Sequence, residues 1–348
     1  MGKFILRRVG VMILTALCLT FIVFFLTNLY PNLEKLAKTQ GNFRMSDEEV
    51  ATYLNNRGYL QPMVTKYGQW LGVLPGYVIE GTDGKVRARC AEGDQPFEEA
   101  PRFCGVLQGN WGFSTVIKED VGGIIAEKLG LTGILMFWVM LLMVPSALIL
   151  GVLAGMREGS RLDRSLSTFS ISTTATPEYV SGVLFIAIFA SSAVGLKWFK
   201  GTATSAMDNV TFENFFLPVL TIAAYGMGYI ARMTRASMAE VMTSQYIRTA
   251  RLKGVSFPNI VVKHALRNAL IAPFTVIMLQ FPWLLNGVVI VETLFNYKGF
   301  GWTLVLAAGN NDIELLLGVS VISVIVVLVT QLISDIGYVY LNPRISVS

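Results

Sequence analysis

Few residues in this 348-residue chain have side chains suited to enzymatic or metal chemistry. The sequence contains one histidine, His264, and three cysteines, Cys18, Cys90 and Cys104. Because a zinc or iron–sulfur site needs several clustered ligands, we expect no metal site. The phosphate-binding pattern G-x-x-x-x-G-K-[ST] does not occur, and no nucleophile–base constellation is evident. We therefore expect a protein that is not an enzyme and binds no cofactor itself.

Four polar residues within apolar stretches are the remaining chemical candidates. An ionisable group inside a bilayer is costly, so each such residue is a candidate for a solute pathway. Glu178 follows Pro177 and either meets an ammonium group of the solute or stabilises a helix that the proline disturbs. For Glu292 a gating or structural role is favoured over solute contact. Gln280 and Asn286 are weaker pathway candidates, because amides also join neighbouring helices.

The elements that must position these residues are membrane helices. The chain is 53% hydrophobic and only 15% charged, whereas a soluble domain carries about 25% charged residues. A membrane-spanning helix needs about 20 mainly apolar residues. Six segments satisfy this requirement: Val9–Tyr30, Leu131–Met156, Phe169–Leu196, Phe215–Ile230, Ala269–Val291 and Glu314–Leu341. We predict an all-α membrane protein with six transmembrane helices in a single transmembrane domain over residues 1–348.

The charges predict the orientation of these spans. With both termini in the cytoplasm, the cytoplasmic segments hold 14 of the 28 basic residues but only four of the 23 acidic ones. Basic residues concentrate in short cytoplasmic loops of membrane proteins, so this orientation is favoured. Asp335, near the inner end of the last span, is expected to pair with a cytoplasmic base. The net charge of +5 is too small to indicate nucleic-acid binding.

Residues 31–130 are too long for a plain connection and are predicted to form a small extracytoplasmic insert between the first two spans. Within it, Ser46 and Glu49 fit a capping box at the start of a helix, and residues 81–84 fit the turn of a hairpin. Cys90 and Cys104 lie on the oxidising side of the membrane. We expect them to form a disulfide, with two unpaired thiols as the alternative.

The segment 232–268 is a basic, patterned cytoplasmic loop. Its apolar residues recur at helical spacing up to Gly254, a natural helix end, and Ser256 with Pro258 is suited to begin a second short helix. We expect two helices joined at a glycine bend. From the residues alone, contact with anionic lipid and docking of a soluble partner are equally supported.

Within this loop the chain resembles a known family. Residues 248–254 (R-T-A-R-L-K-G) and 264–269 (H-A-L-R-N-A) resemble the EAA loop of ABC importer permeases, in the form typical of the dipeptide/oligopeptide subfamily. Of the general pattern E-A-A-x3-G-x9-I-x-L-P, three positions match (Ala250, Gly254 and Leu266). Arg248 replaces the Glu, His264 the Ile and Arg267 the Pro. Residues 6–8, 109–114, 159–164, 291–301 and 340–344 also match family signatures, whereas Leu74–Leu107 looks like an additional piece.

The resemblance implies a type I ABC importer permease fold in a bacterial inner membrane. The implied partners are a second permease, favoured to be a homologue, two cytoplasmic ATPases that hold ATP and Mg, and an extracytoplasmic substrate-binding protein. The loop would be the coupling element that an ATPase receives. The residues that the resemblance assigns to coupling are Tyr246, Arg248, Thr249, Ala250, Arg251, Gly254, His264 and Leu266. Ala250 and Gly254 would be small because the bend presses against that partner.

The solute is predicted to be peptide-like, and other interpretations remain. Related permeases carry oligosaccharides, opines or nickel, and nothing in the sequence fixes the ligand. An ion-coupled secondary transporter would be expected to show inverted repeats and several intramembrane ionisable residues, and the sequence shows no convincing repeat. A membrane-embedded enzyme would require a catalytic constellation, which the sequence lacks.

Overall fold

The computed structural model describes residues 2–81, 86–90, 98, 100–192 and 196–341, and within these the side chains of 2–5, 281–287 and 338–341 are excluded. The described chain is mainly helical and divides into two compact units. The larger unit contains Met1–Gly10, Gly130–Trp302 and Val326–Ser348, and the smaller contains Val11–Leu129 and Thr303–Ile325. Four helices are long and apolar enough to cross a membrane, or up to six spans if two bent helix pairs are each counted as one.

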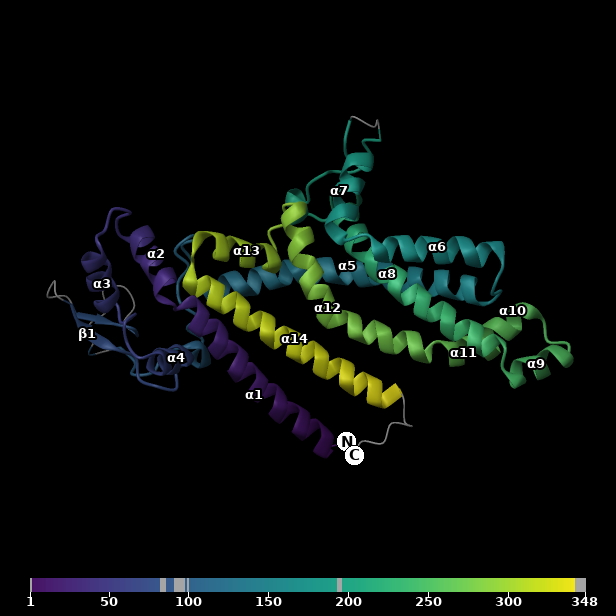
Figure 1. The fold of residues 1–348 in the computed structure, drawn as a ribbon, viewed down its shortest axis with the longest axis horizontal. Coiled ribbons are helices and arrows are strands. Elements are labelled where there is room, and N and C mark those ends of the chain that lie inside the picture. The colour runs from purple at the N-terminus through teal and green to yellow at the C-terminus, as the bar shows by residue number, and fades with distance from the viewer. Residues whose placement is uncertain (1, 82–85, 91–97, 99, 193–195, 342–348) are drawn as a thin grey trace. The chain divides into compact units, whose positions relative to one another are not determined.

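The larger unit is built mainly from long helices (Figure 1). The first and last helices, α1 (Gly2–Thr27) and α14 (Ile313–Leu341), each contribute one end to this unit. Near those ends Arg8 and Asp335 form an ion pair at 3.4 Å, as expected for the acid at the inner end of the last span. The other main helices are α5 (Val121–Gly155), α6 (Arg161–Ala175), α7 (Glu178–Phe189), α8 (Phe212–Met242) and α12 (Ile271–Leu294), with a short 3-10 turn η2 (Thr204–Ala206) before α8.

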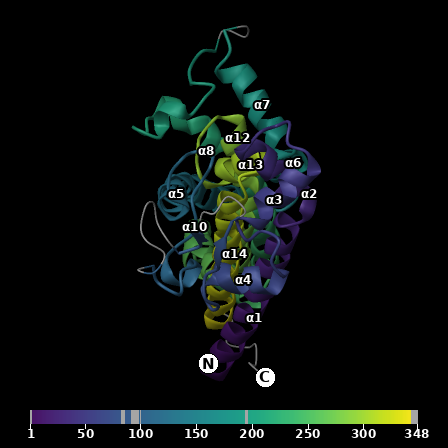
Figure 2. The same cartoon turned by 90° about the vertical axis from the view of Figure 1, so that its left-hand side faces the viewer.

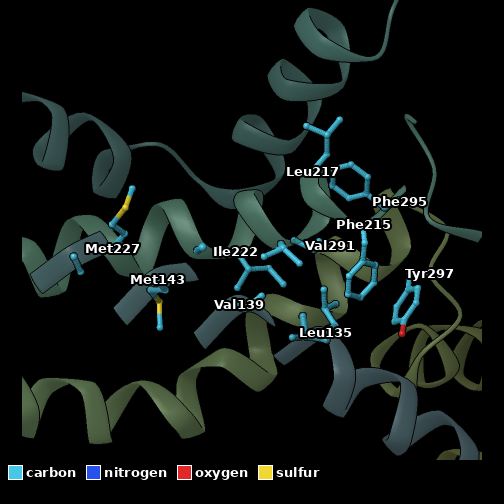
Figure 3. Packing of buried hydrophobic residues seen from close by; sticks show 14 of the residues in the cluster. Leu135, Val139, Met143, Phe215, Leu217, Ile222, Met227, Val291, Phe295 and Tyr297 are labelled. Carbon is cyan, nitrogen blue, oxygen red and sulfur yellow. The ribbon is translucent and has the colours of Figure 1, made fainter. Parts of the chain in front are cut away.

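Helix α8 is the central element of the larger unit. In its most apolar stretch 72% of the residues are buried, against 22% for α5, and α6, α7 and α12 all pack on it. Figure 3 shows the apolar cluster that results, with Leu135, Val139 and Met143 of α5 next to α8 side chains. Because lipid covers exposed apolar surface as well as protein does, the greater burial marks α8 as the helix around which the others assemble.

Tyr297 lies at one edge of this cluster, close to Phe215 (Figure 3). Its hydroxyl donates a hydrogen bond to the Leu131 carbonyl at 2.9 Å. Burial raises the pKa of the Tyr297 phenol above its ordinary value, so the group remains a neutral donor. This bond fixes the segment after α12 to the start of the second predicted span.

The third predicted span is broken. Helix α6 ends at Ala175, Thr176 is extended (φ −91°, ψ 120°), and α7 begins at Glu178 after a 108° bend. The cause is Pro177, whose ring disfavours helical geometry at the residue before it. A second bend, of 51°, separates Phe257–Ala269, most of which lies before the fifth predicted span, from α12. Of the six expected spans, the third is therefore a bent pair, whereas α12 runs through nearly all of the fifth.

The smaller unit has its own apolar core. Its short elements, several of which lie together in Figure 2, are α2 (Tyr30–Gln40), α3 (Asp47–Asn55), α4 (Met63–Leu71), strands β1 (Val78–Glu80) and β2 (Val86–Ala88), and η1 (Val106–Gln108). The core combines α2–α4 with Phe24 of α1 and with Ile313, Leu317 and Val321 of α14. The unit also receives the beginning of α5 and most of α13 (Phe300–Asn310).

Three local predictions within residues 31–130 are confirmed. Ser46 and Glu49 form the reciprocal capping box at the start of α3. Strands β1 and β2 pair antiparallel, with Ile79 opposite Arg87. Of the predicted turn, residues 81–84, positions 82–84 lie outside the described part of the chain. A disulfide joins Cys90 and Cys104. The described part of residues 31–130 thus contains a capped helix, a pair of strands and a covalent link.

Asp312, at the turn between α13 and α14, fixes the segment before α5 to this unit. Its carboxylate accepts hydrogen bonds from the Ser114 hydroxyl at 2.7 Å and from the Val116 and Leu315 backbone N–H groups at 3.1 and 3.2 Å. The Leu315 bond satisfies one of the unpaired donors at the start of α14. The family-like stretch at 109–114 is therefore tied to the last membrane helix.

Candidate functional site

The basic loop forms a helical hairpin, residues 245–268, that follows the end of α8 (Figure 1). Its elements are α9 (Gln245–Leu252), α10 (Phe257–Asn259), a π-helical segment η3 (Ile260–Ala265) and α11 (Leu266–Ala269). A separate apolar cluster joins Ile247 and Ile260 of the loop to Met238 and Met242 of α8. The Asn268 amide also donates a hydrogen bond to the Tyr246 hydroxyl at 2.9 Å, which closes the hairpin.

The bend of the hairpin is a Schellman motif at the end of α9. Gly254 has a φ of +78°, in the left-handed region that glycine adopts without strain. The Gly254 N–H donates to the Arg251 carbonyl at 3.0 Å, and the Val255 N–H donates to the Ala250 carbonyl at 3.2 Å. These are the two bonds that define the motif. The predicted glycine stop is thus confirmed, and its cause is the backbone angle.

The two faces of the hairpin differ sharply in composition. Ile247, Ala250 and Ala265 are buried against the chain's own cluster. The opposite face exposes five basic residues, Arg248, Arg251, Lys253, Lys263 and Arg267, together with Thr249 and His264. Residues 245–268 contain no acidic side chain. The loop therefore exposes a positively charged surface, while its apolar side chains pack against α8.

The burial of Ala250 changes the explanation for its small size. Its side chain is 8% exposed and packs inside the cluster beneath the loop, so a larger residue would disturb this chain's own packing. Nothing in the chain lies within 4 Å of a Cβ built on Gly254. Packing within the chain is therefore sufficient to explain the small side chain of Ala250. The left-handed backbone angle is sufficient to explain the glycine at position 254. Neither residue requires the expected pressure from a partner as its explanation.

An ion pair anchors the neighbouring loop to α8. Arg235 donates from Nε and Nη2 to the Asp163 carboxylate at 2.5 and 2.8 Å. Asp163 lies in the first turn of α6, its side chain is 3% exposed, and it also accepts bonds from the Gly159 N–H and the Ser167 hydroxyl. Two parallel N–H···O bonds to one carboxylate fix orientation as well as distance. The start of α6 is thus held to the C-terminal half of α8.

Glu292 caps the start of α13 from the last turn of α12. It is fully buried, and its carboxylate accepts hydrogen bonds from the Thr132 hydroxyl and, at 2.9 Å, from the Trp302 N–H. The Thr132 hydroxyl in turn accepts from the Phe300 N–H at 2.8 Å. A carboxylate at the first turn of a helix meets unpaired N–H groups and the positive end of the helix dipole. A Cβ at Gly299 would overlap both Glu292 and Thr132, which explains the glycine.

Comparison with known proteins identifies the family. Residues 147–347 match the family described as binding-protein-dependent transport system inner membrane component. This match covers more than half of the chain, including the coupling-like loop. The chain belongs to this family. It is a permease subunit of an ABC importer, of the dipeptide/oligopeptide type that the sequence motifs indicate.

Three relatives illustrate the similarity. A probable peptide ABC transporter permease protein, y4tP of Sinorhizobium fredii, is 35% identical over 69% of this permease and 77% of its own length. The oligopeptide transport system permease protein AppB of Bacillus subtilis is 28% identical over 99% of both chains. The glutathione transport system permease protein GsiC of Escherichia coli K12 is 33% identical over 69% of this permease and 76% of its own length.

The pathway candidates whose side chains are described have different surroundings in the permease. Glu178 is the first residue of α7, directly after the bend, and is partly exposed. Gln280 is buried within α12, and Glu292 is enclosed by the cap described above. The side chain of Asn286 lies outside the described part of the permease. Of the candidates whose side chains are described, only Glu178 combines charge with access.

Sequence reasoning missed the partner of Asp163. The pattern S-x-x-D at residues 160–163 signals a helix start, and Ser160 does accept a bond from the Asp163 N–H at 3.1 Å. No local signal indicates that a base 72 residues further along completes the site. Among the described residues, no group of three or more histidine, cysteine or carboxylate side chains is arranged to hold a metal ion.

Proposed function

We propose that this permease forms, with a second and homologous permease, the path by which a peptide-like solute enters a bacterial cell. An extracytoplasmic binding protein delivers the solute, and two cytoplasmic ATPases, which hold ATP and Mg, supply the work. The names of the relatives support a peptide, since they are described as peptide, oligopeptide and glutathione permeases. Oligosaccharide, opine or nickel import by the same machinery is the alternative.

The proposed topology has six spans, with both termini in the cytoplasm. The third span is a bent helix pair, which membrane proteins tolerate where neighbouring helices satisfy the freed backbone groups. The distribution of bases supports the orientation, because the loop around Gly254 and the loop around Arg161 are both basic. Residues 31–130 then lie outside the cell, where their disulfide is stable. We infer that this insert contacts the binding protein.

The observation that carries the proposal is the basic hairpin at residues 245–268. It is fixed to α8 by its apolar face and exposes its charged face, as a transmitter of movement to or from a soluble partner requires. A flexible loop would absorb that movement. ATP-driven closure of the ATPases would bias the bundle between two states through this contact.

Charge reversal tests the coupling surface. Arg251→Glu changes an exposed residue of the hairpin, and Arg44→Glu makes the same change on an exposed residue of the insert. We expect Arg251→Glu to reduce co-purification of the ATPase subunits in mild detergent at least several-fold and Arg44→Glu to leave it unchanged. Retention of the ATPases by the Arg251 variant would contradict the proposed coupling surface. Loss of the ATPases only in the Arg44 variant would contradict the proposed orientation.

The solute is tested on the partner that selects it. We expect short peptides to raise the melting temperature of the binding protein and to stimulate ATP hydrolysis by the assembled transporter. Oligosaccharides and nickel complexes should do neither. A sugar or a metal complex that produced both effects would replace the peptide as solute and leave the importer assignment intact.

A further inference from the structure

A small polar cavity lies inside the smaller unit. Its volume is about 60 Å³. Four parts of the chain that are distant in sequence line it: the end of α1, the segment from Arg57 to Trp70, Tyr77 with Arg89, and the first turn of α14. A cavity of this size holds more than one water molecule, because one water needs only about 10–15 Å³ measured in this way.

The cavity contains an unusual number of unsatisfied polar atoms. In the described part of the chain, four buried side-chain nitrogen or oxygen atoms have no hydrogen-bond partner, and three of them belong to residues that line this cavity: Trp70 Nε1, Arg89 Nε and Glu314 Oε2. Trp70 is only 2% exposed. Buried polar groups in native proteins are nearly always paired with protein or with ordered water, so these three atoms indicate an occupant.

The chemistry of the three atoms selects the occupant. Two are N–H donors and one is a carboxylate acceptor. A halide or another simple anion accepts hydrogen bonds but would leave Glu314 Oε2 unpaired beside a second negative charge. A metal cation would leave both N–H groups unpaired and would meet three basic residues, Arg57, Lys66 and Arg89, in the same wall. Water both accepts and donates, and it alone satisfies all three atoms.

The wall of the cavity is otherwise well ordered. The Lys66 ammonium donates to the Tyr59 carbonyl at 2.9 Å and to the Asn28 amide oxygen at 3.3 Å, and burial lowers its pKa. The Arg89 backbone N–H donates to the Tyr77 carbonyl at 2.9 Å, next to the Cys90–Cys104 disulfide. The residues that line the cavity are therefore held by contacts within the chain.

We propose that this cavity is an internal water site whose ordered molecules bridge Trp70, Arg89 and Glu314. In this arrangement the water joins the segment that carries Arg89 to α4 and to the first turn of α14. Arg89 belongs to the Leu74–Leu107 segment that looks like an addition to the family pattern, so hydration links a described part of that segment to a predicted membrane helix. The inference is independent of the solute that the permease carries.

X-ray radiolytic labelling in ¹⁸O water tests the site in the full-length permease purified with its complex. Hydroxyl radicals formed from bound water oxidise adjacent side chains even when bulk solvent cannot reach them. Trp198, which is 61% exposed against 2% for Trp70, is the reference. Exposure alone predicts that Trp70 is labelled roughly thirtyfold more slowly (61 divided by 2). With water in the cavity, we expect the two rates to agree within about threefold.

Two variants assign the label to the proposed site. Glu314→Leu removes the acceptor and is expected to return Trp70 labelling to the slow rate. Glu314→Gln retains a polar group that water can meet by reorienting, and it should keep the fast rate. If Glu314→Leu does not fold, Arg89→Leu gives the same comparison from the opposite wall. A slow Trp70 rate in the unchanged permease, or a fast rate in both leucine variants, would overturn the proposal.

Discussion

Two glycines with the same φ angle allow the coupling role of the basic hairpin to be tested separately from its stability. Gly254, at the bend of the hairpin, and Gly159, between α5 and α6, both have a φ of +78°. A Cβ added at either position would meet nothing within 4 Å. The same substitution at the two sites therefore has the same local cost, and any difference in transport must come from where each site lies.

The size of that local cost follows from the backbone alone. The left-handed backbone conformation costs an L-residue about 1–2 kcal/mol of stability relative to glycine. For a β-branched residue the cost approaches about 3 kcal/mol. We expect Gly254→Ala and Gly159→Ala to destabilise the permease by about 1 kcal/mol each, and the two valine variants by about 2–3 kcal/mol. In thermal unfolding in detergent, we expect the melting temperature to fall from glycine to alanine to valine at both sites, by the same amount at each site.

Transport should distinguish the two sites. In vesicles containing the complete transporter, we expect Gly254→Val to uncouple ATP hydrolysis from solute uptake and to lower uptake per ATP at least tenfold. Gly159→Val should retain the normal ratio despite equal destabilisation. Normal coupling in Gly254→Val, or equal uncoupling in the two valine variants, would refute the assignment of the hairpin as the coupling element.

Three further predictions concern the contacts that hold the fold. Asp163→Asn should destabilise the permease by about 2 kcal/mol, because it removes the charge from two short bonds to Arg235, and thermal unfolding at low and high salt will measure it. Reduction of the Cys90–Cys104 link should cost about 3 kcal/mol for its 15-residue loop and lower the melting temperature, whereas a Cys90→Ser/Cys104→Ser variant should not respond to reductant. Glu292→Gln should destabilise by about 2 kcal/mol without changing the solute concentration that half-saturates uptake, since both carboxylate oxygens are used within the chain; a selective change in that concentration would instead favour solute contact.

Several features were predictable because their causes are local. The capping box at Ser46, the glycine stop at Gly254 and the approximate positions of the membrane helices depend on residues within one or two turns of each other. The disulfide was expected from the pairing of two cysteines in one extracytoplasmic segment, and the structure contains it. The family was identifiable because its motifs are short, ordered and distributed along the chain.

The exact course of the third predicted span was not predictable from hydropathy. A hydropathy window over residues 169–196 detects apolar content but not direction, and Pro177 turns the chain by 108° within it. Glu178 consequently lies at the start of a helix rather than inside one. The burial of Glu292 was also beyond sequence reasoning, since its partners Thr132 and Trp302 come from other elements.

Composition, periodicity and backbone preference were enough to predict a helical membrane protein with a basic loop that bends at a glycine, and short motifs that resemble a known family indicated a permease. All of these signals act over a few residues. The folded chain was needed to show which face of the loop is available, that Ala250 faces inward, and that Asp163 is paired with Arg235. Such facts depend on groups that are far apart in sequence and meet only when the helices pack, so no local pattern encodes them.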